Sequence, residues 1–343
     1  MIKYGFWALL LILIFTEGCG PSRLDQKKKH FLHKGNLSYK EKMYQDAIRY
    51  YQEAIQVDSS FAQAYNNLGI VYYKTGMLDK AVQAFSDCIN IDLNFTDAHY
   101  NRNNVYYELG KYQESLNDLY KIQQEYPSKE VILFSKGLSF FGLKNYDSAA
   151  YAFERALTLD SLNEEIYLNL ATTKFYQDDF NTAEKLGQQA LSLDERAPDA
   201  YNLLGMIEVE KQNYDLALNY YERGLQLESN NAYILNNRGY VFLELNELPK
   251  ALLDINESIV INSENPWAYR NKAIYYYKNN DFVNAERLLE QSIKMDRSLP
   301  ESHFYLASIY LKKDQKDRAC LEFQASANLG EQDGEKAYQQ YCR

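Results

Sequence analysis

Asparagine recurs at one place in a repeating pattern, and its carboxamide is suited to binding an extended peptide. The side chains stand 34 residues apart or at multiples of that spacing: Asn67, Asn101, Asn169, Asn237 and Asn271. Asn202, one place earlier in its own segment, extends the column. Each carboxamide offers donors and an acceptor, so a column of them can bind a peptide backbone without reading its sequence. The alternative is that each Asn makes only local hydrogen bonds.

Aromatic side chains recur near the same column. Tyr73, Tyr107 and Trp267 are the ones that we expect to contact a partner, with Phe141, Phe175, Tyr233 and Tyr277 in similar places. Such side chains supply apolar pockets for a partner, although several of them are equally compatible with core packing. Carbohydrate binding by these rings is a third interpretation.

Two arginines occupy a place where other segments carry leucine. Arg102 and Arg238 are each followed 16 residues later by an aspartate, Asp118 and Asp254 respectively. A half-buried guanidinium needs a carboxylate partner. We therefore predict that Arg102 pairs with Asp118 and Arg238 with Asp254, in a structural role.

Catalytic and metal-binding patterns are not found in the sequence. It has no glycine-rich phosphate loop, no Gly-x-Ser-x-Gly elbow and no Cys-x-x-Cys pair. The four histidines are scattered without metal-ligand spacing: His30, His33, His99 and His303. The net charge of -10 argues against a nucleic-acid partner, which would need basic stripes. We expect no enzyme activity, no cofactor and no metal.

The elements that position these residues are short amphipathic helices arranged in hairpins. In residues 62–93, apolar residues recur three and four apart on both sides of a turn at residues 74–76. A small residue such as Gly69 or Ala81 stands where the two helices would touch, and a large one such as Phe85 fills the space beside it. One hairpin cannot bury its own apolar face, so each needs neighbours.

This pattern returns nine times in register and resembles the tetratricopeptide repeat family. The resemblance implies an all-α solenoid, a right-handed superhelix of about nine helix pairs whose first helices line a concave groove. The repeats are expected at 28–61, 62–95, 96–129, 130–163, 164–197, 198–231, 232–265, 266–299 and 300–333. Residues 334–343 are expected to form a capping helix that covers the last repeat.

The first residues read as a targeting signal. Lys3 precedes an apolar run over residues 4–15 that is too short to span a bilayer. A small residue and then Cys19 follow, which resembles a bacterial lipoprotein signal, so we expect removal of residues 1–18 and lipidation of Cys19. The alternative is an ordinary signal cut after Gly20. Residues 19–27 are expected to be a polar tether.

Basic residues follow this tether. The run Lys27-Lys28-Lys29-His30 is interpreted as a solvated face of the first helix, with contact to anionic headgroups as the alternative.

The remaining cysteines fit an exported protein. Cys88 falls at a small core position and is expected to be buried and inert. Cys320 and Cys342 are expected to form a disulfide that locks the capping helix.

These features together predict a non-catalytic scaffold or adaptor that binds a protein or extended peptide in its groove. The location implied by the resemblance is the cell envelope, lipid-anchored, at the outer membrane of a Gram-negative bacterium on either its periplasmic or its outer face. The alternatives are a subunit that presents substrates to a separate transferase or protease, and a carbohydrate-binding module.

Overall fold

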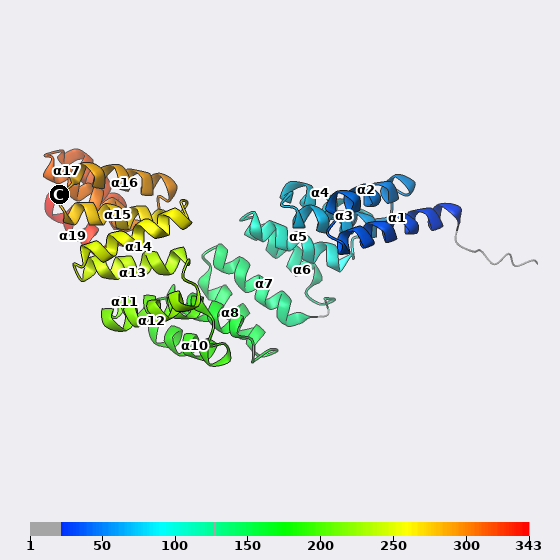
Figure 1. Cartoon of the computed structure of the whole chain (residues 1–343), viewed down its shortest axis with the longest axis horizontal. Helices are drawn as coiled ribbons and strands as arrows, with labels where there is room; N and C mark the ends of the chain where they lie inside the picture. Colours follow the sequence, from blue (N-terminus) through cyan, green and yellow to red (C-terminus); the bar gives the residue numbers. More distant parts are fainter. Residues whose placement is uncertain (1–21, 127, 343) are drawn as a thin grey trace, which may run out of the picture. The chain divides into compact units, whose positions relative to one another are not determined.

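Residues 22–126 and 128–342 are described by this computed structural model of the chain (Figure 1). Within these residues there are 19 helices and no strand. Within each of the chain's two compact units, consecutive helices pack against each other, which confirms the expected all-α solenoid. The chain divides into two compact units, residues 1–143 and 144–343.

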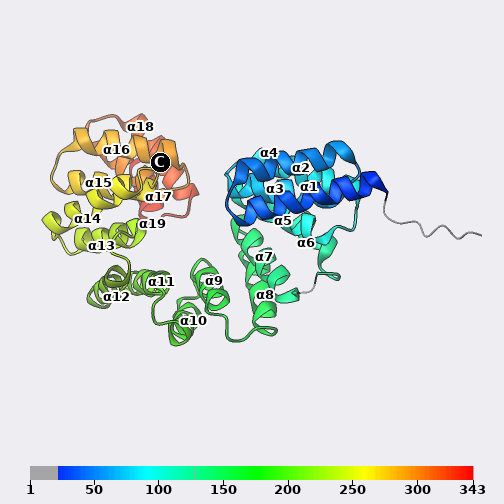
Figure 2. The same cartoon turned by 45° about the vertical axis from the view of Figure 1, so that its right-hand side comes forward.

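The first unit contains helix pairs and one further helix, shown from blue to green in Figures 1 and 2. Its helices are α1 (Arg23–Lys40), α2 (Tyr44–Val57), α3 (Ala62–Lys74), α4 (Leu78–Ile91), α5 (Thr96–Glu108), α6 (Tyr112–Ile122) and α7 (Lys129–Gly142).

The second unit continues the same alternation of first and second helices to the end of the chain. Its helices are α8 (Tyr146–Leu157), α9 (Glu164–Phe175), α10 (Phe180–Leu193), α11 (Pro198–Glu210), α12 (Tyr214–Leu227), α13 (Ala232–Glu244), α14 (Leu248–Ile261), α15 (Pro266–Lys278), α16 (Phe282–Met295), α17 (Pro300–Lys312), α18 (Lys316–Asn328) and α19 (Gln332–Cys342).

Small residues let the two helices of a pair approach closely. A Cβ atom added to Gly69 on α3 would lie 2.6 Å from the ring of Phe85 on α4, a distance that real contacts do not show. Phe85 and Ala81 are both fully buried beside it. The alternation of small and large side chains in the sequence is therefore the packing of each hairpin.

The turn between the two helices of a pair has one conformation throughout. The residue at the same place in each pair has a left-handed φ of about 57° to 72°, for example Gly76, Lys144 and Asn280. Only two of these nine residues are glycines, Gly76 and Gly110. Glycine is therefore not required at this turn, which explains why the repeat is easier to recognise from its helix contacts than from its turns.

Helix boundaries differ from the expected ones at both ends. The side chain of Ser22 accepts a hydrogen bond from the backbone N–H of Asp25 at 3.0 Å and so caps α1 at Arg23. Residues 23–27, expected to belong to a tether, are therefore helical. At the other end α19 begins at Gln332, two residues before the expected cap.

No helix within the described ranges is long and apolar enough to cross a bilayer. The signal segment 1–18, Cys19 and the first residues of the tether lie outside these ranges.

Candidate partner-binding face

The first helices of successive pairs contact one another within each unit. In the first unit α1 contacts α3 and α3 contacts α5, and in the second unit α9, α11, α13, α15 and α17 form a continuous series. Successive second helices share no comparable contact in the described part of either unit. The first helices therefore lie on the inner side of each unit's curvature, and we call this surface the first-helix face.

Asparagines on this face form a hydrogen-bonded chain in the first unit. The carboxamide of Asn101 on α5 donates to Asn66 Oδ1 on α3 at 3.1 Å, and Asn66 donates to its neighbour Asn67 at 3.4 Å. Asn67 in turn donates to Asn36 Oδ1 on α1 at 2.9 Å. The Tyr51 hydroxyl also donates to Asn36, at 2.7 Å. The carboxamides thus link three successive first helices.

The second unit builds a second chain with the same arrangement. Asn271 on α15 donates to Asn236 Oδ1 on α13 at 2.9 Å, and Asn236 donates to Asn237 at 3.3 Å. Asn237 donates to Asn202 on α11 at 2.9 Å. Arg270 Nε donates to Asn271 Oδ1 at 3.0 Å and extends this chain.

Binding of a peptide backbone along the asparagine column, as expected from the sequence, would require its carboxamides to face water or a ligand, and these bonds show that not all of them do. Asn271 is fully buried, so the expectation is wrong for this residue. The physical reason is that successive first helices touch, which places each of these asparagines beside an asparagine of the preceding first helix. Asn169 and Asn202 are the exceptions, because each donates within its own helix: Asn169 to the backbone carbonyl of Glu165 at 2.8 Å and Asn202 to the sulfur of Met206 at 3.9 Å.

The partners Asn36, Asn66 and Asn236 were not singled out from the sequence. The adjacent pairs Asn66-Asn67 and Asn236-Asn237 were a usable signal, since two carboxamides in a row can bond both to each other and to a neighbouring helix.

Exposed aromatic rings on this face remain open to a partner. Tyr233 at the start of α13 is 55% exposed and Trp267 at the start of α15 is 40% exposed. Tyr107 on α5 is also exposed, whereas Tyr73 on α3 is half-buried. Beside Trp267, the buried Asn265 accepts from the backbone N–H of Trp267, and its own Nδ2 has no hydrogen-bond partner among the described residues.

Negative charge collects on the first-helix face of the second unit. Burial raises the pKa of Glu210 at the end of α11, and the charges of Glu301 and Asp178 raise it further. Arg270 on α15 partly balances this charge, with Nη1 3.0 Å from Glu301 Oε2. Burial also raises the pKa of Glu331, and the charge of Glu301 adds to that shift. Electrostatic complementarity on this face therefore favours a partner segment that carries positive charge.

The first unit holds a cleft of about 340 Å³ between its first three helices. It is lined by His33, Asn36, Leu37, Tyr39, Lys40, Tyr51, Asn67 and Ile70. His33 and Lys40 are exposed at this cleft, so it combines an apolar floor with two basic side chains.

Sequence profiles identify the repeats. A tetratricopeptide repeat profile matches residues 100–164, 205–266 and 270–334, which together make up more than half of the chain. Further tetratricopeptide profiles match residues 35–76, 62–95 and 162–230. The chain belongs to the tetratricopeptide repeat family. Tetratricopeptide repeats bind protein partners and are typically non-catalytic.

Solved structures show the same fold at low sequence identity. A chain of the anaphase-promoting-complex hetero-tetramer Cut9–Hcn1 matches with a TM-score of 0.64 and 14% identity, over 94% of this chain and 78% of that one. A tetratricopeptide repeat protein from Parabacteroides merdae matches with a TM-score of 0.65 and 18% identity, over 73% and 99%. PilF of Pseudomonas aeruginosa matches with a TM-score of 0.52 and 17% identity, over 62% and 97%. No curated protein sequence matches significantly.

The two unusual arginines of the tetratricopeptide repeats lie against the expected aspartates. Arg102 donates to Asp118 from Nε at 2.8 Å and from Nη2 at 2.7 Å. Arg238 donates to Asp254 from Nε at 2.7 Å and from Nη2 at 2.9 Å. Both aspartates are buried. Each bidentate pair joins the two helices of its own repeat.

Histidine adds a partner that the sequence interpretation missed. His99 Nδ1 lies 2.8 Å from Asp118 Oδ1, so Asp118 holds both His99 and Arg102. The same two places in the last repeat hold His303 and Glu322, with Nδ1 2.6 Å from Glu322 Oε2. His303 Nε2 lies 3.1 Å from the Arg297 carbonyl. Both nitrogens of this ring face oxygen acceptors, an arrangement that only the doubly protonated imidazolium satisfies.

We expect the last repeats to lose stability as the pH rises. The hydrogen bond to Glu322 raises the pKa of His303, with burial opposing and the Arg297 carbonyl adding to the increase. A raised pKa in the folded state gives stability that is fully present below the unfolded value of about 6.5 and is lost as the pH rises through the folded pKa. Urea unfolding between about pH 6 and pH 9 measures it. His303→Gln should remove this pH dependence. The control is His30→Gln, which changes an exposed histidine on α1 and should keep it. If the difference in the free energy of unfolding between wild type and the His303→Gln variant does not change with pH, the assignment is refuted.

The described cysteines form one disulfide and one buried free thiol. Cys320 on α18 and Cys342 on α19 form a disulfide, with their Cα atoms 5.6 Å apart. Cys88 on α4 is fully buried, and burial raises the pKa of its thiol to about 12, so the thiol stays protonated and unreactive at neutral pH. Within residues 22–126 and 128–342, no cluster of His, Cys, Asp or Glu could hold a metal ion.

Proposed function

We propose that this chain is a protein-interaction scaffold of the bacterial cell envelope, anchored by lipid on Cys19, and that a partner binds along the first-helix face of its second unit. The observation that carries the binding proposal is the pair of exposed rings, Tyr233 and Trp267, on adjacent first helices. Exposed aromatics beside a polar rim are typical of the few residues that dominate a protein interface.

The chemistry of this face indicates the kind of partner. Three carboxylates lie near the helices that carry the two rings: Glu210, Glu301 and Glu331. Their charge favours an extended partner segment that carries lysine or arginine. Tyr240, whose ring faces the Arg270 guanidinium at 5.5 Å, adds aromatic surface. The asparagine chains serve this face in another way than by binding a peptide backbone. They hold successive repeats in register and so keep the rings at a constant spacing.

The envelope location rests on the signal-like N-terminus and the small residue before Cys19. A chain of similar fold in a hetero-tetramer, Cut9–Hcn1, supports the idea that this architecture assembles with a second protein. The rival functions are presentation of substrates to a separate enzyme and binding of carbohydrate by the same rings.

Replacing both rings is expected to weaken capture of the partner strongly. We expect Tyr233→Ala with Trp267→Ala to lower the yield of crosslinked partner from detergent-solubilised envelope by about tenfold or more, since interface aromatics commonly contribute about 2 kcal/mol each. The matched control is Tyr151→Ala with Leu253→Ala, which removes two similarly exposed side chains from the second helices α8 and α14. Mass spectrometry identifies the partner.

Two results would contradict the proposal. Equal yields from the ring variant and its control would place the partner elsewhere, and selective recovery of a glycan would favour the carbohydrate alternative. The anchor is tested separately by the intact mass of the membrane-extracted chain, which should show loss of residues 1–18 and acyl chains on Cys19. An unprocessed or unacylated mass would refute the anchor.

A further inference from the structure

Helix α1 carries positive charge at a density that contrasts with the chain as a whole. Six of its 18 residues are Lys or Arg and one, Asp25, is acidic, within a chain of net charge -10. The helix begins four residues after Cys19.

Ion pairs within the fold neutralise two of these cations. Lys28 Nζ lies 2.6 Å from Asp58 Oδ2, and Lys29 Nζ lies 2.8 Å from Asp25 Oδ2. The other four cations of α1 form no ion pair within the described residues: Arg23, Lys27, Lys34 and Lys40. Lys27 Nζ lies 5.8 Å from the centre of the Phe31 ring and Lys34 Nζ lies 5.4 Å from that of Tyr50. These ring contacts leave the positive charges without a counter-charge inside the described part of the fold, so they can attract an external anion.

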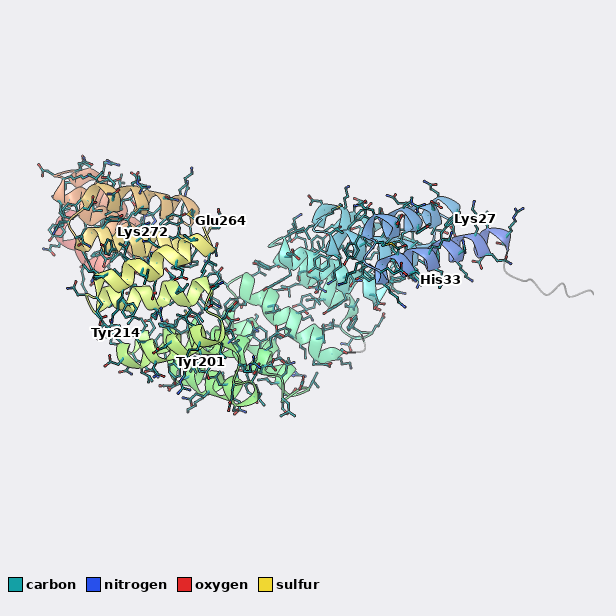
Figure 3. The ribbon with its side chains drawn as sticks, viewed as in Figure 1. Lys27, His33, Tyr201, Tyr214, Glu264 and Lys272 are labelled. Carbon is teal, nitrogen blue, oxygen red and sulfur yellow. A yellow bond between two sulfur atoms is a disulfide. The ribbon has the colours of Figure 1, made fainter. Side chains whose placement is uncertain are left out.

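Three of these four cations, all but Lys40, lie in one line along the helix. Lys27 follows Arg23 by four residues and Lys34 follows Lys27 by seven, which places all three within about 40° of arc at 100° per residue. His30 lies in the same line, and Figure 3 shows Lys27 near the start of α1. We call Arg23, Lys27, His30 and Lys34 the basic stripe.

Exposed leucines border the basic stripe. Leu37, one turn beyond Lys34, is 45% exposed, and Leu24, beside Arg23, is 64% exposed. The fold occupies the side of α1 next to the stripe, since Leu32, Gly35 and Ser38 are buried at about 180°, 120° and 60° from Arg23 around the helix. Lys34 is accordingly half-buried. The stripe is thus a straight edge of charge about 17 Å long, from Arg23 to Lys34, with exposed leucines near both ends.

We propose that the basic stripe of α1 docks on an anionic phospholipid surface, with the helix axis parallel to the bilayer. A bilayer presents a plane of phosphates that matches a straight row of cations, and each surface lysine or arginine adds about fivefold to the affinity for an anionic membrane. The bordering leucines are placed to enter the headgroup region. This inference deepens the envelope location proposed above, because it adds an orienting contact to the anchor.

The test uses the full chain with Cys19→Ser, so that no acyl chain is present. Partition coefficients are measured on vesicles of phosphatidylcholine and on vesicles with equal parts of phosphatidylcholine and phosphatidylglycerol. The apolar segment 4–15 contributes equally to both coefficients, so their ratio isolates the electrostatic contribution. We expect a large ratio that falls as salt is added.

Charge reversal should then remove the preference for anionic vesicles. Arg23→Glu, Lys27→Glu and Lys34→Glu together should lower the ratio by about a hundredfold or more. The matched control carries Lys185→Glu, Lys294→Glu and Lys316→Glu, three exposed lysines of the second unit, and changes the net charge by the same amount. The control should keep most of the ratio, and circular dichroism should show the same melting curve for both.

The inference is overturned if the wild-type ratio is near one, or if both triple variants lower it equally. It is also overturned if the stripe variant keeps the ratio and instead loses protein capture, which would make the stripe a protein interface. These outcomes are independent of the ring variants and of the acyl mass, so failure of the docking can be told apart from failure of the proposed function.

Discussion

Replacing Asp118 with alanine is expected to lower the free energy of unfolding by about 3–5 kcal/mol, the largest effect of any single change proposed for this chain. Asp118 is buried and accepts from Arg102 through both oxygens, and it also faces His99. Its removal leaves a guanidinium and an imidazole without their carboxylate in a site of low water access.

A double-mutant cycle separates the pairing from the individual side chains. Arg102→Leu with Asp118→Ala should cost much less than the sum of the two single changes, because neither charge is then left unpaired. Asp254→Ala provides the matched comparison, since Asp254 holds Arg238 without a histidine. We expect it to destabilise less than Asp118→Ala. Additive single changes in urea unfolding would show that the two side chains do not stabilise each other.

Loss of the Cys320–Cys342 disulfide is expected to destabilise the C-terminal repeat and its cap by about 3 kcal/mol, from the chain-entropy estimate for a loop of this length. The two cysteines are 22 residues apart. Helix α19 covers the last repeat through Ala337, which joins the same core cluster as Leu306 and Phe323. Hydrogen exchange of the α18 and α19 amides measures the effect locally, which suits a repeat array that need not unfold as one unit.

Reductant provides the control for this prediction. The variant with Cys320→Ser and Cys342→Ser should exchange rapidly with or without reductant, whereas wild type should resemble it only when reduced. Cys88→Ala, whose disulfide is intact, should respond to reductant as wild type does. If full reduction leaves exchange in wild-type α19 unchanged, the disulfide adds no stability to the cap.

The candidate site was predictable from the sequence in part. Trp267 and Tyr107 are exposed on first helices, at places that the repeat spacing indicates. The asparagine column is also on first helices, but Asn271 is buried and the others bond to Asn36, Asn66, Asn202 or, for Asn169, to a backbone carbonyl. Sequence spacing shows on which side of its own helix a residue lies, and it does not show how close the next first helix comes.

The basic stripe illustrates the same limit. The sequence places lysines at 27, 28 and 29, and nothing in it separates Lys27 from Lys28. The structure distinguishes them, because Asp58 Oδ2 at the end of α2 lies 2.6 Å from Lys28 Nζ and so neutralises Lys28 but not Lys27. Likewise, the sequence indicates a partner for Arg102 at Asp118 but gives no reason to add His99.

By itself, the sequence determined the helical hairpins and the pairs that pack within them, such as Gly69 with Phe85, because these contacts are close in the chain and recur with a constant period. Only the tertiary structure decided which polar side chains are satisfied inside the protein and which remain open to a partner. The reason is that this choice depends on contacts between successive repeats, where hydrogen-bonding distance is set by the approach of whole helices and not by residue spacing.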